Sequence, residues 1–269
     1  MTKLVYEHTG IVIQPEKSYL FETRLAPVAR RFNLASIDDI FITLQSSRNK
    51  DLERAVFEAM TTNETYFFRD VKPFDLMKEL VLPRLFTARK STKNISIWCA
   101  ACASGQEPYS LAMLLKDALK SQPGWSISIT ATDISTEMVD RAKKGLYTQF
   151  EVQRGLPIQL LVKYFTEKGE NWQVNREIRD MVTFRQFNLL DQPNSLSPRF
   201  GFDVIFCRNV LIYFDTHTRT DILTRLSKVI AKDGALFLGG AETIIGLSNL
   251  FETFPEDRGV YRLAHPAAK

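Results

Sequence analysis

The spacing of hydrophobic residues changes near residue 93 and divides the chain into two parts. In the first part, apolar side chains recur every three or four residues, which is the spacing of one buried helix face. One such run comprises Phe21, Leu25, Val28 and Phe32. Pro27 lies inside this run, and because a proline within a helix removes a backbone hydrogen bond, we expect it to kink or split the helix.

Two more helices are predicted before the spacing changes. Ser36 with Asp39 indicates the start of one helix, and 51–60 forms the next. No strand pattern occurs in this part of the sequence. We therefore predict a small all-helical N-terminal domain over 1–62, followed by a linker over 63–75.

From Lys93 onward, strands alternate with helices. Buried or alternating strands are predicted at 95–100, 126–132, 202–207, 235–239 and 259–263, the last as an edge strand. The helix between the first two strands has an apolar face within 111–119. A later helix has one within 222–230 and is expected to end with Gly234 as its C-cap. This alternation predicts a doubly wound α/β domain over 76–269.

One segment interrupts the alternation of strands and helices. Within 163–187, the stretches 172–175 and 181–187 alternate in the way of antiparallel strands. We therefore predict a small antiparallel β insertion over 163–187, on the edge of the main domain.

Composition and charge narrow the class of protein. Apolar residues make up 45% and charged residues 25%, as in an ordinary globular protein. No stretch approaches the roughly 20 apolar residues that span a bilayer, and Met1–Gly10 lacks the apolar region of a signal peptide. We therefore expect a cytoplasmic protein without direct membrane insertion. The net charge of +4 is not gathered into a basic stripe, so no nucleic-acid partner is expected.

The cysteines do not predict a metal or redox centre. Cys99 and Cys102 form a C-x-x-C, but the only other cysteine is Cys207. The three histidines are scattered along the chain at His8, His217 and His265. We favour buried thiols at the end of a strand over redox chemistry or half a metal site. No metal is therefore predicted.

A strand, a turn, a helix, a second strand and an acid follow one another over 95–133. The turn 101–107 contains small residues and one glycine, so it is not the G-x-G-x-x-G of pyrophosphate binders. Asp133 ends the second strand, where a carboxylate can accept hydrogen bonds from both hydroxyls of a ribose. The pattern predicts a nucleoside site without a diphosphate grip, which suits S-adenosylmethionine better than NAD. The alternative is that Asp133 caps the next helix at Ser135.

Four stretches of the chain resemble the CheR-type chemotaxis receptor methyltransferases. They are MTTNETYFFRD at 60–70, WCAACASGQEPYS at 98–110, ATDI at 131–134 and CRNVLIYF at 207–214. The resemblance covers essentially the whole chain, including the helical N-terminal part and the β insertion. One departure is the turn sequence SGQE, where the family often has GEE, but Glu107 is retained.

The resemblance implies a Rossmann-like methyltransferase domain behind an all-helical domain. It implies transfer of a methyl group from S-adenosylmethionine to glutamate side chains in the cytoplasmic helical bundle of chemoreceptors, with S-adenosylhomocysteine as product. Arg69 and Tyr213 resemble the catalytic residues nearest the transferred methyl. The implied cofactor-binding residues are Asn63, Thr65, Arg69, Glu107, Asp133, Asn188, Leu189, Arg208 and Asn209.

The resemblance also assigns parts of the cofactor to individual residues. Glu107 would hold the methionine or ribose end, Asp133 the ribose, and 188–189 the adenine.

A glutamate carboxylate has an ordinary pKa of about 4.3, so it is ionised at neutral pH and needs no general base. The remaining task is alignment of the reacting atoms. We therefore expect Arg69 and Tyr213 to orient substrate or cofactor, not to move protons.

Three features leave alternatives open. Lys17, Arg24 and Arg31 recur at seven-residue spacing, either as a helix face toward the receptor or as a solvated face, and Pro27 disturbs their phase. The β insertion either binds a receptor tether peptide by strand addition or simply ends the sheet. The chain could instead methylate another substrate or bind S-adenosylmethionine as a non-catalytic signalling module. A monomer is expected.

Overall fold

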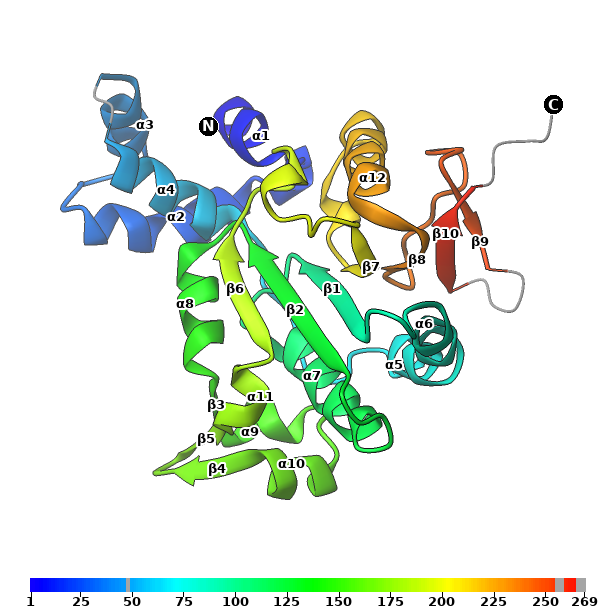
Figure 1. Ribbon diagram of the computed structural model, residues 1–269. Coiled ribbons are helices and arrows are strands. Elements are labelled where there is room, and N and C mark those ends of the chain that lie inside the picture. Colours follow the sequence, from blue (N-terminus) through cyan, green and yellow to red (C-terminus); the bar gives the residue numbers. More distant parts are fainter. Residues whose placement is uncertain (47–48, 255–258, 265–269) are drawn as a thin grey trace.

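The computed structural model describes residues 1–46, 49–254 and 259–264. Helices form the N-terminal part of the protein. They are α1 (Thr2–Thr9), the short 3-10 helix η1 (Pro15–Lys17), α2 (Tyr19–Arg31), α3 (Ile37–Ser46) and α4 (Lys50–Met60). Val5, Leu25, Ile40 and Leu52 are fully buried among them. These helices thus enclose a hydrophobic core of their own, at one end of the molecule (Figure 1).

The predicted start of α3 is confirmed, and of the two effects expected of Pro27 the split of α2 is wrong, while the kink stays a prediction. The N–H of Asp39 donates to Ser36 Oγ at 3.1 Å, and the N–H of Ser36 donates to Asp39 Oδ2 at 3.0 Å. In α2, however, Pro27 lies inside one uninterrupted helix. The residues after it, Val28 and Ala29, are buried in the helical core. Their burial keeps the chain helical despite the cost of about 3 kcal/mol that an interior proline imposes.

A central sheet organises the rest of the chain. Among the described residues its seven strands lie in the order β6-β2-β1-β7-β8-β10-β9. In that order they are Val182–Gln186, Ser126–Asp133, Asn94–Ala100, Phe202–Cys207, Ile230–Leu238, Val260–Leu263 and Phe251–Thr253. The first five are parallel. The chain runs outward from β1 in one direction and resumes at β7 in the other, so the topological switch point lies between β1 and β7.

Both faces of the sheet are covered, which makes a three-layer α/β domain (Figure 1). Ile97 and Val204 point into one core with α5 (Lys72–Leu76), η2 (Met77–Val81), α6 (Leu82–Ala88), α7 (Gln106–Leu119) and α8 (Thr136–Lys144). Trp98 and Ile205 point into a second core with α12 (Thr216–Val229). The adjacent strand residues thus face opposite layers, as the alternation along a strand requires. The predicted doubly wound α/β class is confirmed.

The small antiparallel sheet exists, but its predicted membership is partly wrong. It has the order β3-β5-β4, with β3 at Leu146–Thr148, β5 at Asn171–Val174 and β4 at Phe165–Lys168. The helices beside it are α9 (Gln149–Gln153), α10 (Ile158–Tyr164) and α11 (Arg176–Arg179). The stretch predicted at 181–187 forms β6 instead, which pairs in parallel with β2. Alternation along a strand does not reveal the direction of its partner, so sequence could not separate the two cases.

Two predictions near the C-terminus are also wrong. Gly234 does not cap α12, because that helix ends at Val229 and Gly234 lies within β8. The pairing of β7 with β8 shifts register there, and a Cβ on Gly234 would lie 3.0 Å from the Asp203 carbonyl oxygen. The glycine thus permits a close approach of two strands. The strand predicted at the edge, β10, lies between β8 and β9, and β9 forms the edge.

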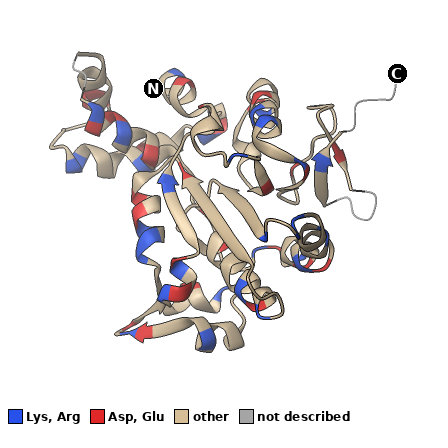
Figure 2. Ribbon diagram, in the orientation of Figure 1, with Lys and Arg blue, Asp and Glu red and all other residues tan. Residues whose placement is uncertain are grey.

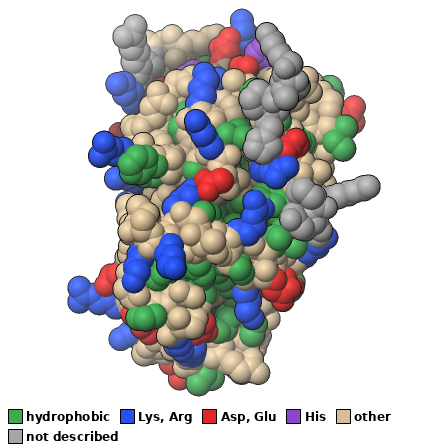
Figure 3. Space-filling view, turned by 45° about the vertical axis from the view of Figure 1, so that its right-hand side comes forward, with side chains coloured by type: hydrophobic (Ala, Val, Ile, Leu, Met, Phe, Trp, Pro, Cys, Tyr) green, Lys and Arg blue, Asp and Glu red, His purple; other side chains and the backbone are tan. Residues whose placement is uncertain are grey.

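Charged residues lie mostly on the helices and loops, while the strands of the central sheet are largely uncharged (Figure 2). On the face shown in Figure 3, lysine and arginine side chains are spread over the surface and not gathered in one patch. Within the described parts of the chain, no helix combines the length and the apolar character needed to cross a membrane.

Gly155, in the loop between α9 and α10, provides a test of how closely the linker packs on that loop. A Cβ at this position would lie 2.1 Å from the Phe67 carbonyl oxygen, and its φ is +84°. Gly169 also has a positive φ, of +61°, but a Cβ there meets nothing within 4 Å. We expect Gly169→Ala to lower the free energy of unfolding by about 1 kcal/mol, from backbone strain alone. Gly155→Ala should lower it by about 3 kcal/mol, because the clash is with backbone.

Urea unfolding of both variants measures this difference. Gly169→Ala is the matched control, because it introduces the same methyl group at the same kind of backbone conformation. Equal losses in the two variants would contradict the close packing of the linker.

Candidate active site

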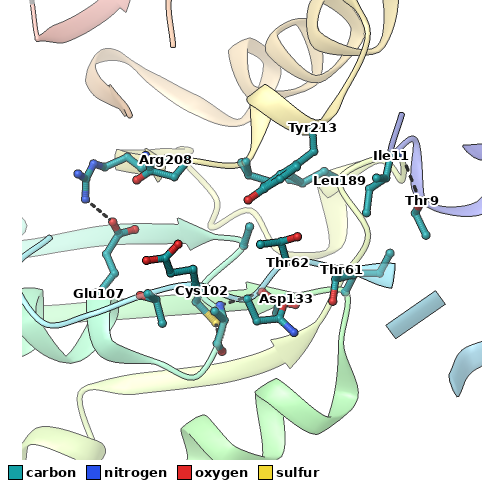
Figure 4. Close-up of a pocket in the computed structure, with 18 of the residues that line it drawn as sticks. Thr9, Ile11, Thr61, Thr62, Cys102, Glu107, Asp133, Leu189, Arg208 and Tyr213 are labelled. Atoms are coloured by element: carbon teal, nitrogen blue, oxygen red, sulfur yellow. Dashed lines mark hydrogen bonds and ion pairs between the residues drawn. The ribbon is translucent and has the colours of Figure 1, made fainter. Parts of the chain in front are cut away.

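A pocket opens at the carboxyl ends of β1, β2, β6 and β7, next to the switch point (Figure 4). It encloses about 850 Å³, including its open mouth. All the residues that the sequence analysis assigned to catalysis or cofactor binding line it. They are Asn63, Thr65, Arg69, Glu107, Asp133, Asn188, Leu189, Arg208, Asn209 and Tyr213. The structure thus brings together residues from five separate stretches of the chain, while their individual roles stay predictions.

Asp133 holds a buried carboxylate at the end of β2. Its side chain accepts the N–H of Ala103 at 2.8 Å and the N–H of Ser135 at 2.9 Å, each on a different oxygen. Burial raises the pKa of Asp133, and these backbone hydrogen bonds oppose that rise in part. Ser135, not Asp133, is the N-cap of α8, because its Oγ accepts the N–H of Met138. Each oxygen of Asp133 keeps lone pairs for a ligand.

The turn after β1 is strained and tied to β2. Ala101 and Ala103 have φ values of +56° and +45°, a region that residues with a Cβ rarely adopt. The N–H of Cys102 donates to the Thr132 carbonyl at 2.9 Å, and the N–H of Ala103 reaches Asp133. Such strain persists only where the surrounding structure fixes it, and it is frequent at functional sites. The small side chains leave the backbone of this turn accessible from the pocket.

An ion-pair network closes one side of the pocket. The Arg208 side chain is fully buried and donates to Glu107 Oε2 at 2.6 Å and to Asp70 Oδ2 at 2.8 Å. It also donates to the Arg69 carbonyl oxygen at 3.0 Å. Burial raises the pKa of Glu107, and the charges of Arg208 and Arg69 oppose that rise. Arg208 therefore joins the end of β7 to α7 and to the linker. In this position it also lines the pocket.

The two residues predicted to be catalytic approach the pocket from different elements. Arg69 comes from the linker, where its guanidinium donates to the Glu64 carbonyl at 2.8 Å and lies 5.7 Å from the Tyr66 ring centre. Tyr213 comes from the 3-10 helix η4 (Leu211–Tyr213), which is separated from the end of β7 by the three residues 208–210. Its ring lies across the pocket from Glu107, as Figure 4 shows. Both side chains are half-buried, so each can still meet a ligand.

The N-terminal domain supplies a wall of the pocket that the sequence analysis missed. Thr9 and Ile11 line the pocket, and Ile11 forms an antiparallel bridge with Phe214 (Figure 4). The Asn188 side chain donates to the His8 carbonyl at 2.7 Å, so it binds the end of α1. Its Oδ1 accepts the N–H of Leu190 at 3.0 Å. No local pattern signals these contacts, because they join segments that are far apart in sequence.

The predicted basic row on the first long helix is wrong. Lys17 lies in η1, outside α2. Arg24 donates to the carbonyl oxygens of Met60 at 2.8 Å and Thr61 at 2.9 Å. It also donates to Thr62 Oγ1 at 3.0 Å. Arg24 therefore holds the start of the linker, where Thr61 and Thr62 line the pocket.

Comparison with protein families covers both domains. Residues 63–260 match the family model described as CheR methyltransferase, SAM binding domain. Residues 1–61 match the family model described as CheR methyltransferase, all-alpha domain.

Individual relatives extend over nearly the full length. The chain is 40% identical over 247 residues to chemotaxis protein methyltransferase 1 of Pseudomonas aeruginosa, covering 90% of this chain and 88% of that protein. It is 38% identical over 258 residues to chemotaxis protein methyltransferase 1 of Vibrio cholerae, covering 94% of this chain and 92% of that protein. It is 33% identical over 255 residues to the chemotaxis protein methyltransferase of Escherichia coli, covering 93% and 85%.

Removing the charge of Arg208 tests the ion-pair network. Arg208→Met leaves Glu107 buried without its partner, so we expect a loss of about 3–5 kcal/mol in the free energy of unfolding near neutral pH. The pKa of Glu107, already raised by burial, should rise further. A carboxyl group with a raised pKa in the folded state holds its proton more tightly there, so stability falls as pH rises toward that pKa. The deficit should therefore be smaller at about pH 5 than at about pH 8.

The double variant Arg208→Met/Glu107→Gln is the control, because it removes both charges. Its deficit should not change between those two pH values in denaturant titrations. A pH-independent deficit in the single variant would contradict the assigned pairing.

Proposed function

This chain belongs to the CheR methyltransferase family, and we propose that it transfers a methyl group from S-adenosylmethionine to glutamate side chains of chemoreceptors, forming methyl esters. The observation that carries the proposal is that all the residues assigned to catalysis or cofactor binding line one pocket at the switch point. The relatives with the name chemotaxis protein methyltransferase support the chemoreceptor as substrate. The proposed partner is the cytoplasmic helical bundle of the receptor, met by a cytoplasmic monomer.

The chemistry of the pocket fits S-adenosylmethionine. Asp133 offers carboxylate oxygens for the ribose hydroxyls at the place where doubly wound domains bind nucleosides. Phe187 and Leu189 offer apolar surface for the adenine ring. Glu107 and Arg69 supply one negative and one positive charge for the amino and carboxylate groups of the methionine part.

The pocket suits a transfer that needs no general base. When bound, S-adenosylmethionine supplies an electrophilic methyl group on a positively charged sulfur. A glutamate carboxylate, with an ordinary pKa of about 4.3, is already an ionised nucleophile at neutral pH. No histidine is among the described residues that line the pocket. Burial raises the pKa of the Cys102 thiol well above its usual value, so it stays protonated.

Arg69 and Tyr213 are proposed to orient the reacting groups. Arg69 carries a positive charge at the pocket and can hold a carboxylate, and the Tyr213 hydroxyl can accept or donate a hydrogen bond. Attack of a carboxylate on a sulfonium neutralises opposite charges, so a site that excludes water favours the reaction over bulk solvent. The wall contributed by Thr9 and Ile11 narrows access of water to the same pocket.

Methyl transfer to receptors tests this proposal together with the role of Arg69. The protein is incubated with tritiated S-adenosylmethionine and membranes that carry chemoreceptors. We expect label on the receptor that is released as methanol in alkali, because esters hydrolyse whereas N-methyl groups do not. Arg69→Ala should lower turnover by about 100-fold or more through lost positioning. Arg154→Ala is the matched control, since its guanidinium lies 4.4 Å from the same Tyr66 ring without lining the pocket.

Each other outcome would contradict part of the proposal. Alkali-stable label would indicate another acceptor group. Cofactor binding without any labelled receptor would favour a methyltransferase for a different substrate or a non-catalytic module. Normal turnover in Arg69→Ala would remove that residue from catalysis.

Asp133→Ala tests the ribose site separately. Loss of hydrogen bonds to a charged acceptor should weaken S-adenosylmethionine binding by about 1.5–3 kcal/mol, or roughly 10- to 150-fold in Kd. Isothermal calorimetry measures the change, and circular dichroism checks that the variant is folded. Asp140→Ala, which removes an exposed carboxylate of α8, should bind as the unaltered protein does. Unchanged affinity in a folded Asp133→Ala protein would exclude the ribose role.

A further inference from the structure

Glu242 lies in the turn after β8, half-buried, and the motifs of the sequence do not include it. Its carboxylate accepts hydrogen bonds from four consecutive backbone N–H groups of 209–212 and from the N–H of Gly239. The donor–acceptor distances are 2.8 Å for Asn209, 2.9 Å for Val210, 2.7 Å for Leu211, 3.3 Å for Ile212 and 2.6 Å for Gly239. The Glu242 N–H in turn donates to the Gly239 carbonyl at 2.9 Å. One side chain thus holds the whole start of the segment that follows β7.

That segment needs such a partner because of its backbone conformation. The chain turns sharply at Asn209, which has a φ of +57°, and then makes only the single turn of η4. The first N–H groups of a helix have no partner within the helix. A carboxylate with two oxygens can accept all of them at once, which a neutral side chain of the same shape cannot do.

Glu242 also packs closely against Gly239, at the end of β8. A Cβ on Gly239 would lie 2.7 Å from Glu242 Oε2 and 2.8 Å from the Asn209 nitrogen, so a glycine is required for this approach. The two carboxylate oxygens bind different segments. Oε2 binds Gly239 and Asn209, and therefore joins the end of β8 to the end of β7. Oε1 binds 210–212, the start of η4.

The segment held in this way carries pocket residues on both sides of the turn. Asn209 is the second residue after β7, and Tyr213 ends η4. Both line the pocket, whereas Glu242 is not among the lining residues. Any shift of the segment would therefore change the pocket without loss of a direct ligand contact by Glu242.

We propose that Glu242 is a positioning residue for methyl transfer, which acts by fixing Asn209 and Tyr213 at the pocket through its carboxylate charge and its two acceptor oxygens. This inference rests on the proposed function. If it holds, loss of the Glu242 carboxylate lowers kcat even in a protein that is still folded.

Glu242→Gln is the first test, because glutamine keeps the shape but has one acceptor oxygen and presents an amide N–H₂ to N–H donors. We expect kcat at saturating substrate to fall roughly 10- to 100-fold, the range for a lost charged hydrogen-bond acceptor that acts on the transition state. The Kd for S-adenosylmethionine should rise by less than kcat falls, because most lining residues keep their places. Glu242→Asp, which retains both acceptors, should recover part of kcat.

Asp203→Asn is the matched control at the opposite end of β7. The Asp203 carboxylate is buried, and like Glu242 it accepts hydrogen bonds from N–H groups, those of Ser96 at 2.8 Å and of Arg89 Nε at 2.7 Å. Asp203→Asn should lower Tm without lowering kcat. Both Asp203→Asn and Glu242→Gln are assayed well below their Tm. This readout separates positioning from a general loss of stability.

The outcomes are distinct for this inference and for the proposed function. A folded Glu242→Gln protein with normal kcat and normal cofactor Kd would overturn the inference, as would equal losses of kcat in Asp203→Asn. If the unaltered protein transfers no methyl group to receptors, the proposed function fails, and calorimetry of cofactor binding still tests whether Glu242 shapes the pocket. If Glu242→Gln does not fold, Glu242→Asp decides, and normal kcat there at reduced Tm would overturn the inference.

Discussion

The buried guanidinium of Arg208 is the interaction on which the site depends. A charge removed from water is tolerated only when partners surround it, and here the partners are Glu107, Asp70 and the Arg69 carbonyl. These partners belong to the helix α7 and to the linker, while Arg208 itself directly follows the strand β7. The need to satisfy one charge therefore sets the distance between the linker and the sheet, and with it the shape of the pocket.

Features that depend on short stretches of sequence could be predicted. The strands around the switch point follow from short buried or alternating stretches of sequence, and Asp133 follows from its place at a strand end. The direction of β6 could not be predicted, because it depends on the partner strand. The same holds for the continuity of α2 through Pro27, which packing decides. Ile11 and Glu242 were missed because their contacts join distant segments, and only the fold brings them together.

Left-handed backbone conformations gather around the pocket. Among the described residues with a side chain, Asp70, Val71, Ala101, Ala103 and Asn209 have positive φ and lie in or beside the segments that line it. Each such residue costs about 1–3 kcal/mol, and the cost persists because hydrogen bonds and ion pairs fix every one of these turns. The result is a pocket whose polar groups are placed before a ligand arrives, which reduces the reorganisation that binding requires.

The bridge between Ile11 and Phe214 has a consequence for the order in which the protein folds. The two residues of this bridge are separated by some two hundred residues along the chain. The Tyr6 hydroxyl, which donates to Asp215 at 2.6 Å, spans a similar separation. Contacts of such long range form late in folding. A chain that is only partly folded therefore lacks a closed pocket, and capture of the ligand requires that the segment after α1 has already docked on the α/β domain.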